Sequence, residues 1–170
     1  MELTNSSAIV TGGASGIGAA AARMLAKKGA KVVIADLQAD KGGELAKEIG
    51  GAFCKVDVTN TQDIVNAVEM AKSMGPIRAL VNSAGIGWAQ RTVGKDGTLE
   101  SAANLDAFKK VIAINLIGTF DCIRVVATAM SRNEPLAHGE RGAIVNIASV
   151  AAFDGQIGRA SCRERVSNCV

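Results

Sequence analysis

Hydrophobic residues in this chain alternate between short continuous runs and longer stretches with helical spacing. The continuous runs are rich in β-branched residues and predict five strands, over residues 8–10, 32–35, 52–56, 79–81 and 143–147. The stretches between them repeat apolar residues every three to four positions and predict helices over residues 17–28, 39–49, 61–74 and 105–131. Continuously apolar strands that alternate with helices are typical of a parallel sheet covered on both faces. The pattern therefore predicts an α/β fold with a doubly wound parallel sheet.

The ends of the later helices carry capping signals. Thr61 and Asn104 are the expected N-caps, and Asp63 and Asp106 fall in first turns, where the helix dipole favours a carboxylate. The apolar residues of the last predicted helix cover more than one narrow stripe. We therefore expect that helix to pack on the sheet and on a second surface.

The junction between the first strand and the first helix is rich in glycine. Residues 11–18 read Thr-Gly-Gly-Ala-Ser-Gly-Ile-Gly. Such a turn directs backbone N–H groups and the positive end of the next helix at one point, where a pyrophosphate can approach without meeting a Cβ atom. The motif predicts a Rossmann-like nucleotide site rather than an ordinary glycine-rich turn, because an acidic residue also ends the next strand. The turn residues expected to bind the cofactor are Gly12, Ser15, Gly16, Ile17 and Gly18.

Acidic residues follow the second and third predicted strands. Asp36 lies where a carboxylate accepts hydrogen bonds from both ribose hydroxyls of an adenosine, with Leu37 beside it. Asp36 would repel a 2′-phosphate, and neither Gly13 nor Leu37 offers a compensating positive charge, so NAD is favoured over NADP. Asp57 is a candidate acceptor for the adenine amine while the Val58 backbone lines the ring. A simple turn role for Asp57 is equally compatible with its position.

Small and polar residues mark the ends of the last two strands. Asn82, Ala84 and Gly85 follow the fourth strand, where the strand order of a doubly wound sheet reverses and a ligand needs room. A tight turn held by the asparagine is compatible with that role. Ser149 follows the fifth strand and is either a holder of a substrate oxygen or a strand terminator. Asn115 interrupts an apolar helix face, so it is either a satisfied core amide or part of a proton relay.

Composition and charge exclude several other classes of protein. The chain has 170 residues, of which 48% are hydrophobic, enough for one domain with a core. Most of its net charge of +3 comes from residues 159–165, and only 3% of residues are aromatic, so no nucleic-acid partner is expected. The four cysteines have no CxxC spacing and, together with the single histidine, offer no metal site. We therefore expect the cysteines to be free thiols. No apolar run long enough for a bilayer and no signal segment are visible, which predicts a cytoplasmic protein with no membrane partner.

The motifs together resemble the short-chain dehydrogenase/reductase family in type, order and spacing. They are Thr11-Gly12-x-x-x-Gly16-x-Gly18, Asp36, Asp57, Asn82-x-Ala84-Gly85, Asn115 and Ser149. The stretch 149–158 and the loop around Trp88 are most similar to the type 2 3-hydroxyacyl-CoA dehydrogenase branch, which includes oxidisers of 17β-hydroxysteroids. The similarity spans about residues 4–158, which predicts one NAD-binding Rossmann domain over residues 1–158 and an unrelated tail over 159–170.

The resemblance implies an NAD-dependent oxidoreductase that transfers hydride between NAD and a secondary alcohol, such as a 3-hydroxyacyl-CoA or a hydroxysteroid. Ser149 would orient the substrate oxygen with Asn115 as a catalytic partner, Gln156 would face the substrate, and intact relatives are homo-oligomers. In the family a tyrosine and a lysine follow the serine, but those positions hold Cys162 and Val166, and the chain contains no tyrosine. We therefore expect a C-terminally incomplete fold of five strands that is inactive by itself.

Two other outcomes are compatible with the same residues. One is a non-catalytic nucleotide-binding fragment, because the expected adenosine and pyrophosphate contacts all precede residue 86. The other is a fragment that folds poorly, because the fifth strand would be an uncovered edge and the long helix would expose an apolar face.

Overall fold

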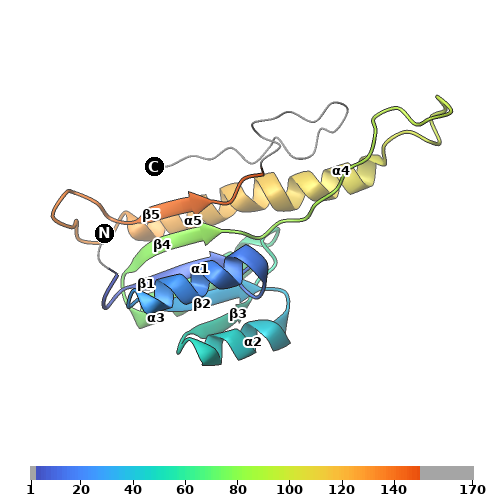
Figure 1. Ribbon diagram of the computed structural model, residues 1–170. Coiled ribbons are helices and arrows are strands. Elements are labelled where there is room, and N and C mark those ends of the chain that lie inside the picture. Colours follow the sequence, from blue (N-terminus) through green and yellow to red (C-terminus); the bar gives the residue numbers. More distant parts are fainter. Residues whose placement is uncertain (1–2, 150–170) are drawn as a thin grey trace.

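Five parallel strands form one sheet in the order β3-β2-β1-β4-β5 in the computed structural model, which describes residues 3–149 (Figure 1). The strands are β1 (Ser7–Thr11), β2 (Lys31–Asp36), β3 (Ala52–Lys55), β4 (Ile77–Asn82) and β5 (Ala143–Asn146). The chain runs outward from β1 to β3 and then returns to the other side of β1, so the strand order reverses between β1 and β4. In open α/β sheets this reversal leaves a crevice at the carboxyl ends of the two strands. The predicted fold class and all five strands are confirmed.

Helices cover both faces of this sheet. They are α1 (Gly16–Lys27), α2 (Ala39–Glu48), α3 (Thr61–Met74), α4 (Leu105–Ile112), the π-helical segment η1 (Ala113–Gly118) and α5 (Thr119–Met130). The core on one face joins the strands to α1 and α2, and the core on the other joins them to α3 and α5. The doubly wound arrangement predicted from the apolar strands is therefore present.

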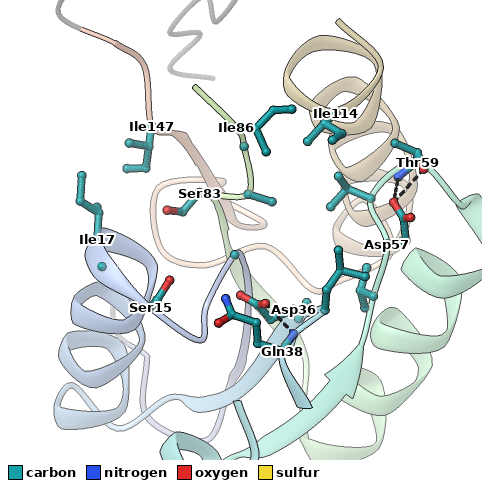
Figure 2. Close-up of a pocket in the computed structure, with 18 of the residues that line it drawn as sticks. Ser15, Ile17, Asp36, Gln38, Asp57, Thr59, Ser83, Ile86, Ile114 and Ile147 are labelled. Carbon is teal, nitrogen blue, oxygen red and sulfur yellow. Dashed lines mark hydrogen bonds between the residues drawn. The ribbon is translucent and has the colours of Figure 1, made fainter. Parts of the chain in front are cut away.

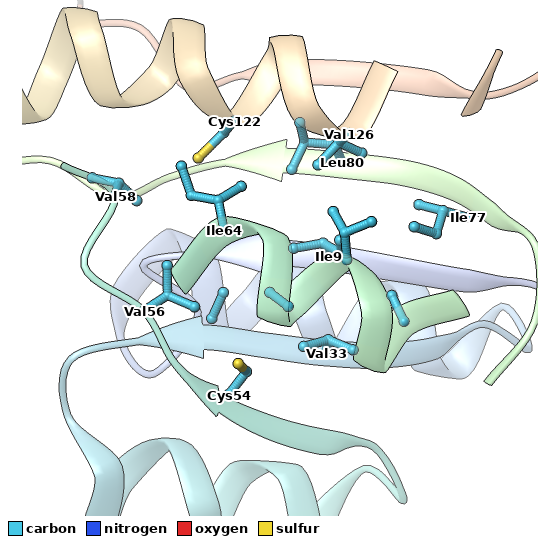
Figure 3. Packing of buried hydrophobic residues seen from close by; sticks show 14 of the residues in the cluster. Ile9, Val33, Cys54, Val56, Val58, Ile64, Ile77, Leu80, Cys122 and Val126 are labelled. Carbon is cyan, nitrogen blue, oxygen red and sulfur yellow. The ribbon is translucent and has the colours of Figure 1, made fainter. Parts of the chain in front are cut away.

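Successive residues of β1 serve these two cores in turn, because side chains alternate across a strand. Ile9 packs with Ile64 of α3 and Val126 of α5, as Figure 3 shows. Ala8 and Val10 lie in the opposite core. All three β1 residues are buried, which explains why this strand is apolar throughout.

One of the two predicted N-caps is wrong. Asn60, not Thr61, caps α3, because the Asn60 side chain accepts a hydrogen bond from the Gln62 N–H (2.9 Å). Thr61 is the first helical residue. The prediction for Asn104 is confirmed, since its side chain accepts a hydrogen bond from the Ala107 N–H (2.9 Å).

One helix bears on the expectation that no segment could cross a bilayer. Leu105–Met130 is a single helical stretch with the length and apolar composition of a membrane span. Its inner side contributes Val111, Cys122 and Val126 to the buried residues. A core helix that packs on a sheet meets the same criterion of length and composition, and α5 packs on β4 and α3 in this way.

Several predictions fall on residues outside the described range. They concern Gln156, the tail 159–170 and the two cysteines within it. Cys54 and Cys122 are described, and both are free and buried, as expected.

Candidate functional site

A cleft of about 830 Å³ opens at the carboxyl edge of the sheet, where the strand order reverses (Figure 2). Its floor is formed by the turns after β1, β2, β3 and β4, and its far wall by α4 and η1. The lining residues are Gly12, Ser15, Gly16, Ile17, Ala35, Asp36, Leu37, Gln38, Val56, Asp57, Val58, Thr59, Ser83, Ala84, Gly85, Ile86, Lys110, Ala113, Ile114 and Ile147. This composition joins a hydrophobic interior to two carboxylates and one cation, the kind of lining found in cofactor pockets.

The glycine-rich turn forms one wall of the cleft. Gly12 and Gly16 have positive φ angles of 62° and 52°, which favour glycine. A Cβ atom at Gly12 would lie 2.6 Å from the Ala84 nitrogen, whereas a Cβ at Gly16 would meet nothing within 4 Å. Gly12 therefore allows two turns to pack closely, and Gly16 leaves open space beside the start of α1.

The first turn of α1 adds N–H groups that no preceding carbonyl of the helix can accept. Ser15 is the N-cap, but its side chain makes no capping hydrogen bond. This end of the helix can therefore direct N–H groups and its positive dipole toward an anion in the cleft. Of the turn residues expected to bind a cofactor, Ser15, Gly16 and Ile17 line the cleft. Gly18 does not line it and lies against Gly12, whose carbonyl oxygen a Cβ at Gly18 would overlap.

Asp36 is held rigidly at the end of β2. Its Oδ2 accepts a hydrogen bond from the Ala14 N–H (3.0 Å), and its Oδ1 accepts one from the Gln38 N–H (2.9 Å). The residue is buried, yet it lines the cleft. Each carboxylate oxygen has more than one lone pair, so both can accept a further bond from a ligand. The glycine-rich turn and the carboxylate therefore form one rigid unit, with Leu37 beside them.

Asp57 follows β3 on the other side of the cleft floor. Its Oδ1 accepts hydrogen bonds from the N–H (2.9 Å) and the hydroxyl (2.7 Å) of Thr59. These bonds, the hydroxyl bond first, hold the pKa of Asp57 below its usual value, so the carboxylate is charged at neutral pH. Within residues 3–149, Asp57 Oδ2 accepts no hydrogen bond. Asp57 thus closes a turn and lines the cleft at the same time, with Val58 beside it.

Asn82 lies beneath the cleft and does not line it. Its Nδ2 donates to Asn146 Oδ1 (2.9 Å), and the Thr11 hydroxyl lies 3.5 Å from Asn82 Oδ1. The Ala84 N–H donates to the same Thr11 hydroxyl (3.3 Å). These contacts join the carboxyl ends of β1, β4 and β5 and place Ala84 and Gly85 at the cleft surface.

The two predicted catalytic residues lie outside the cleft lining. Asn115, in η1, donates from Nδ2 to the Ile86 carbonyl (2.9 Å) and accepts at Oδ1 from the Ile86 N–H (2.9 Å). It is therefore a satisfied buried amide that fixes a cleft residue. Ser149 is half-buried just beyond β5.

Several cleft residues were missed by reasoning from the sequence. Thr59 could have been found, because a threonine two positions after an aspartate is typical of a turn closed by that carboxylate. Lys110 and Ile114 gave no local signal, because only the path of α4 and η1 over the sheet brings them to the cleft. Among residues 3–149, no three His, Cys, Asp or Glu side chains gather as metal ligands would.

Comparisons with known proteins agree with this geometry. The sequence model described as short chain dehydrogenase matches residues 6–161. The 3-hydroxyacyl-CoA dehydrogenase type-2 of Drosophila melanogaster is 48% identical over 162 residues, which cover 94% of this chain and 63% of the relative. The Homo sapiens protein of the same name is 44% identical over 158 residues, 91% of this chain and 59% of the relative. The chain thus spans about three fifths of the length of these relatives.

A solved structure extends the similarity to three dimensions. The 3-hydroxyacyl-CoA dehydrogenase type-2 of Mycobacterium avium superimposes with a TM-score of 0.87 at 42% identity, over 94% of this chain and 62% of that one. A short-chain type dehydrogenase/reductase of Mycobacterium ulcerans superimposes with a TM-score of 0.81 at 24% identity, a similarity of fold alone.

Proposed function

Because the chain belongs to the short-chain dehydrogenase family, we propose that its cleft binds NAD and serves hydride transfer between NAD and a secondary alcohol. The observation that carries this proposal is the position of Asp36, whose carboxylate is fixed beside the glycine-rich turn by the Ala14 and Gln38 N–H groups. A carboxylate at this point suits the two ribose hydroxyls of an adenosine. The predicted resemblance to the family is confirmed.

The residues present fit the adenosine half of the dinucleotide. The open space at Gly16 and the N–H groups at the start of α1 suit the pyrophosphate, which carries the negative charge that a helix N-terminus favours. Asp57 Oδ2 is a free acceptor for the adenine amine, and Val58 lines the ring position. Asp36 disfavours a 2′-phosphate, which supports NAD over NADP.

The remaining chemistry divides between cofactor and chain. When bound, NAD supplies a nicotinamide ring that accepts or returns the hydride of the alcohol carbon. Asn115 fixes Ile86, which lines the cleft, and Ser149 orients the substrate oxygen just beyond β5. We take the substrate class, 3-hydroxyacyl-CoA or a similar alcohol, from the names of the relatives.

We further propose that these 170 residues alone turn over poorly. The chain contains no tyrosine to move the hydroxyl proton, and positions 162 and 166 hold cysteine and valine. Loss of a general acid–base group lowers a rate by roughly 10²- to 10⁴-fold. With acetoacetyl-CoA as the substrate, NADH oxidation should be at least about a thousandfold slower than in an intact relative. Oxidation at a comparable rate would contradict this point.

A second candidate, a nucleotide-binding module without catalysis, is favoured by the same cleft. Calorimetric titration with NAD, AMP and NADP tests the binding proposal common to both. We expect NAD and AMP to bind with similar affinity and NADP to bind at least about tenfold more weakly, since Asp36 meets its phosphate. An Asp36→Ala variant should lose most of that preference. Absence of binding heat for both NAD and AMP would overturn the proposal.

A further inference from the structure

One charged residue of the cleft has no part in the function proposed above. Lys110, on α4, is the only cation among the described residues that line the cleft. Within the described part of the chain its ammonium group makes no hydrogen bond or ion pair, whereas Lys109 Nζ lies 3.4 Å from Asp106 Oδ1. Two adjacent lysines thus face different surroundings, and the one that reaches the cleft has no partner within residues 3–149.

The position of α4 places Lys110 on the same wall of the cleft as Ile114. Lys110 precedes Ile114 by one helical turn, about 6 Å along the axis, and both line the cleft. Figure 2 shows Ile114 on the side of Asp57 and Thr59, away from Ser15 and Ile17.

Close packing fixes this wall to the end of β3. A Cβ atom at Gly118 of η1 would lie only 2.8 Å from Val58 Cγ2 and 2.9 Å from Val58 O. The helical stretch that contains both Lys110 and Gly118 therefore packs directly against Val58, the residue that follows Asp57. Because a lysine side chain is long and flexible, its ammonium can reach over this end of the cleft.

The two charged groups at this end have complementary hydrogen-bonding capacity. Among the described residues no donor reaches Asp57 Oδ2, which is an acceptor, whereas an ammonium such as Lys110 Nζ carries three N–H donors and no lone pair. Adenine presents its amine, a donor, beside ring nitrogens that are acceptors. Hypoxanthine reverses this pattern at the N1 edge, with a carbonyl oxygen in place of the amine and a protonated N1 beside it, whereas N7 is an acceptor in both bases. An acceptor that meets the amine and a donor that meets N1 therefore suit adenine and oppose hypoxanthine.

We propose that Lys110 is a specificity-determining residue for the adenine base, donating from its ammonium to N1, the ring nitrogen beside the amine whose hydrogen bond Asp57 accepts. This inference rests on the proposed nucleotide function of the cleft and adds to it a residue from the far wall. The preference for adenine would then depend on a residue of α4 as well as on residues at the carboxyl ends of the strands.

Calorimetric titration of the 170-residue chain with AMP, IMP and adenosine tests the assignment. The wild type should bind AMP more tightly than IMP. Lys110→Met should lose about tenfold in affinity for AMP and for adenosine alike, and its AMP-to-IMP ratio should fall by a similar factor. Lys109→Met is the matched control, because that lysine is one residue away and outside the cleft lining, and it should stay within about twofold. Lys110 is exposed, so its variant should fold like the wild type.

Three results would overturn the inference in different ways. If Lys110→Met weakens AMP but not adenosine, the cation acts on the phosphate and not on the base. If Lys110→Met binds AMP, IMP and adenosine like the wild type, Lys110 has no role although the nucleotide site itself stands. If the wild type binds neither AMP nor NAD, the proposed function fails and the inference fails with it.

Discussion

Asn115 and Ile86 exchange two hydrogen bonds of 2.9 Å each, one donated by the Asn115 amide and one by the Ile86 N–H. The asparagine lies in the π-helical segment η1, and π-helical turns within α-helices are frequent at functional sites. Ile86 follows β4 and lines the cleft. The pair therefore connects η1 to the loop that follows β4, and it fixes the position of Ile86 at the cleft.

Substitution Asn115→Ala removes both hydrogen bonds and leaves the Ile86 N–H and carbonyl without their partners. Because the site is mostly buried, we expect the free energy of unfolding to fall by about 2 to 3 kcal/mol. Urea unfolding measured by circular dichroism gives this value. Asn66→Ala is the control, since Asn66 is exposed on α3 and should change stability by less than about 0.5 kcal/mol. Equal effects of the two variants would contradict the structural role of Asn115.

The sequence alone predicted the sheet and the floor of the cleft, which the turns after the strands form. Strands such as β1 are buried on both faces, so their apolar runs are visible without tertiary information, and parallel strands bring residues such as Asp36 and Asp57 to one edge. The far wall was not predictable in this way. Whether Lys110 or Lys109 reaches the cleft depends on how α4 rotates and crosses the sheet, which no local pattern records.

Finer details were missed because they depend on hydrogen bonds and close contacts that the apolar spacing does not record. A π-helical turn differs from an α-helical one by about one residue, which a sequence pattern over six residues does not resolve, so η1 was predicted as ordinary helix. Asn60 and Thr61 are both good capping residues, and only the bond to Gln62 decides between them. The packing of Gly18 against Gly12 was likewise not visible in the motif, and it explains why this position has no side chain.

Substitution Gly118→Ala should disturb the cleft through Val58. The new Cβ would meet Val58 Cγ2 at 2.8 Å and Val58 O at 2.9 Å, and neither the backbone nor the buried side chain can yield easily. We expect a loss of about 1 to 3 kcal/mol in the free energy of unfolding, as for other overpacked sites. AMP affinity should fall as well, because Val58 lines the cleft. Thermal unfolding and calorimetry measure the two effects.

Gly43→Ala is a suitable comparison for that variant. Gly43 lies inside α2, and a Cβ there would meet nothing within 4 Å. Because alanine is the better helix former, this variant should gain about 0.5 to 1 kcal/mol in stability. If Gly118→Ala also proved neutral or stabilising, the contact with Val58 would not be restrictive.

The two described cysteines should be inert in the native protein. Burial, and then the charge of Asp121, raises the pKa of Cys122 to about 12, and burial raises that of Cys54. At pH 8 only about one Cys122 in ten thousand is therefore a thiolate, the reactive form. Iodoacetamide should leave both residues unmodified in the native state and alkylate both in urea. Peptide mass spectrometry is the required measurement, because it separates these thiols from Cys162 and Cys169. Rapid native alkylation of Cys122 would contradict the prediction.

A carboxylate between α3 and α5 should make stability depend on pH below neutrality. Asp121 accepts hydrogen bonds from the Thr61 hydroxyl (2.6 Å) and from Arg124 Nε (2.8 Å), and these, the Thr61 bond first, lower its pKa. A pKa lowered by folding contributes stability that is complete above the unfolded value, about 3.9, and is lost as the pH falls through the folded value. Asp121→Asn should therefore be less stable than the wild type by about 1 kcal/mol between pH 5 and 8, and the difference should shrink below about pH 4. Urea unfolding of both proteins across this range measures the difference. A difference that grows on acidification would mean that Asp121 stabilises the fold in its protonated form, the opposite of what its two donors imply.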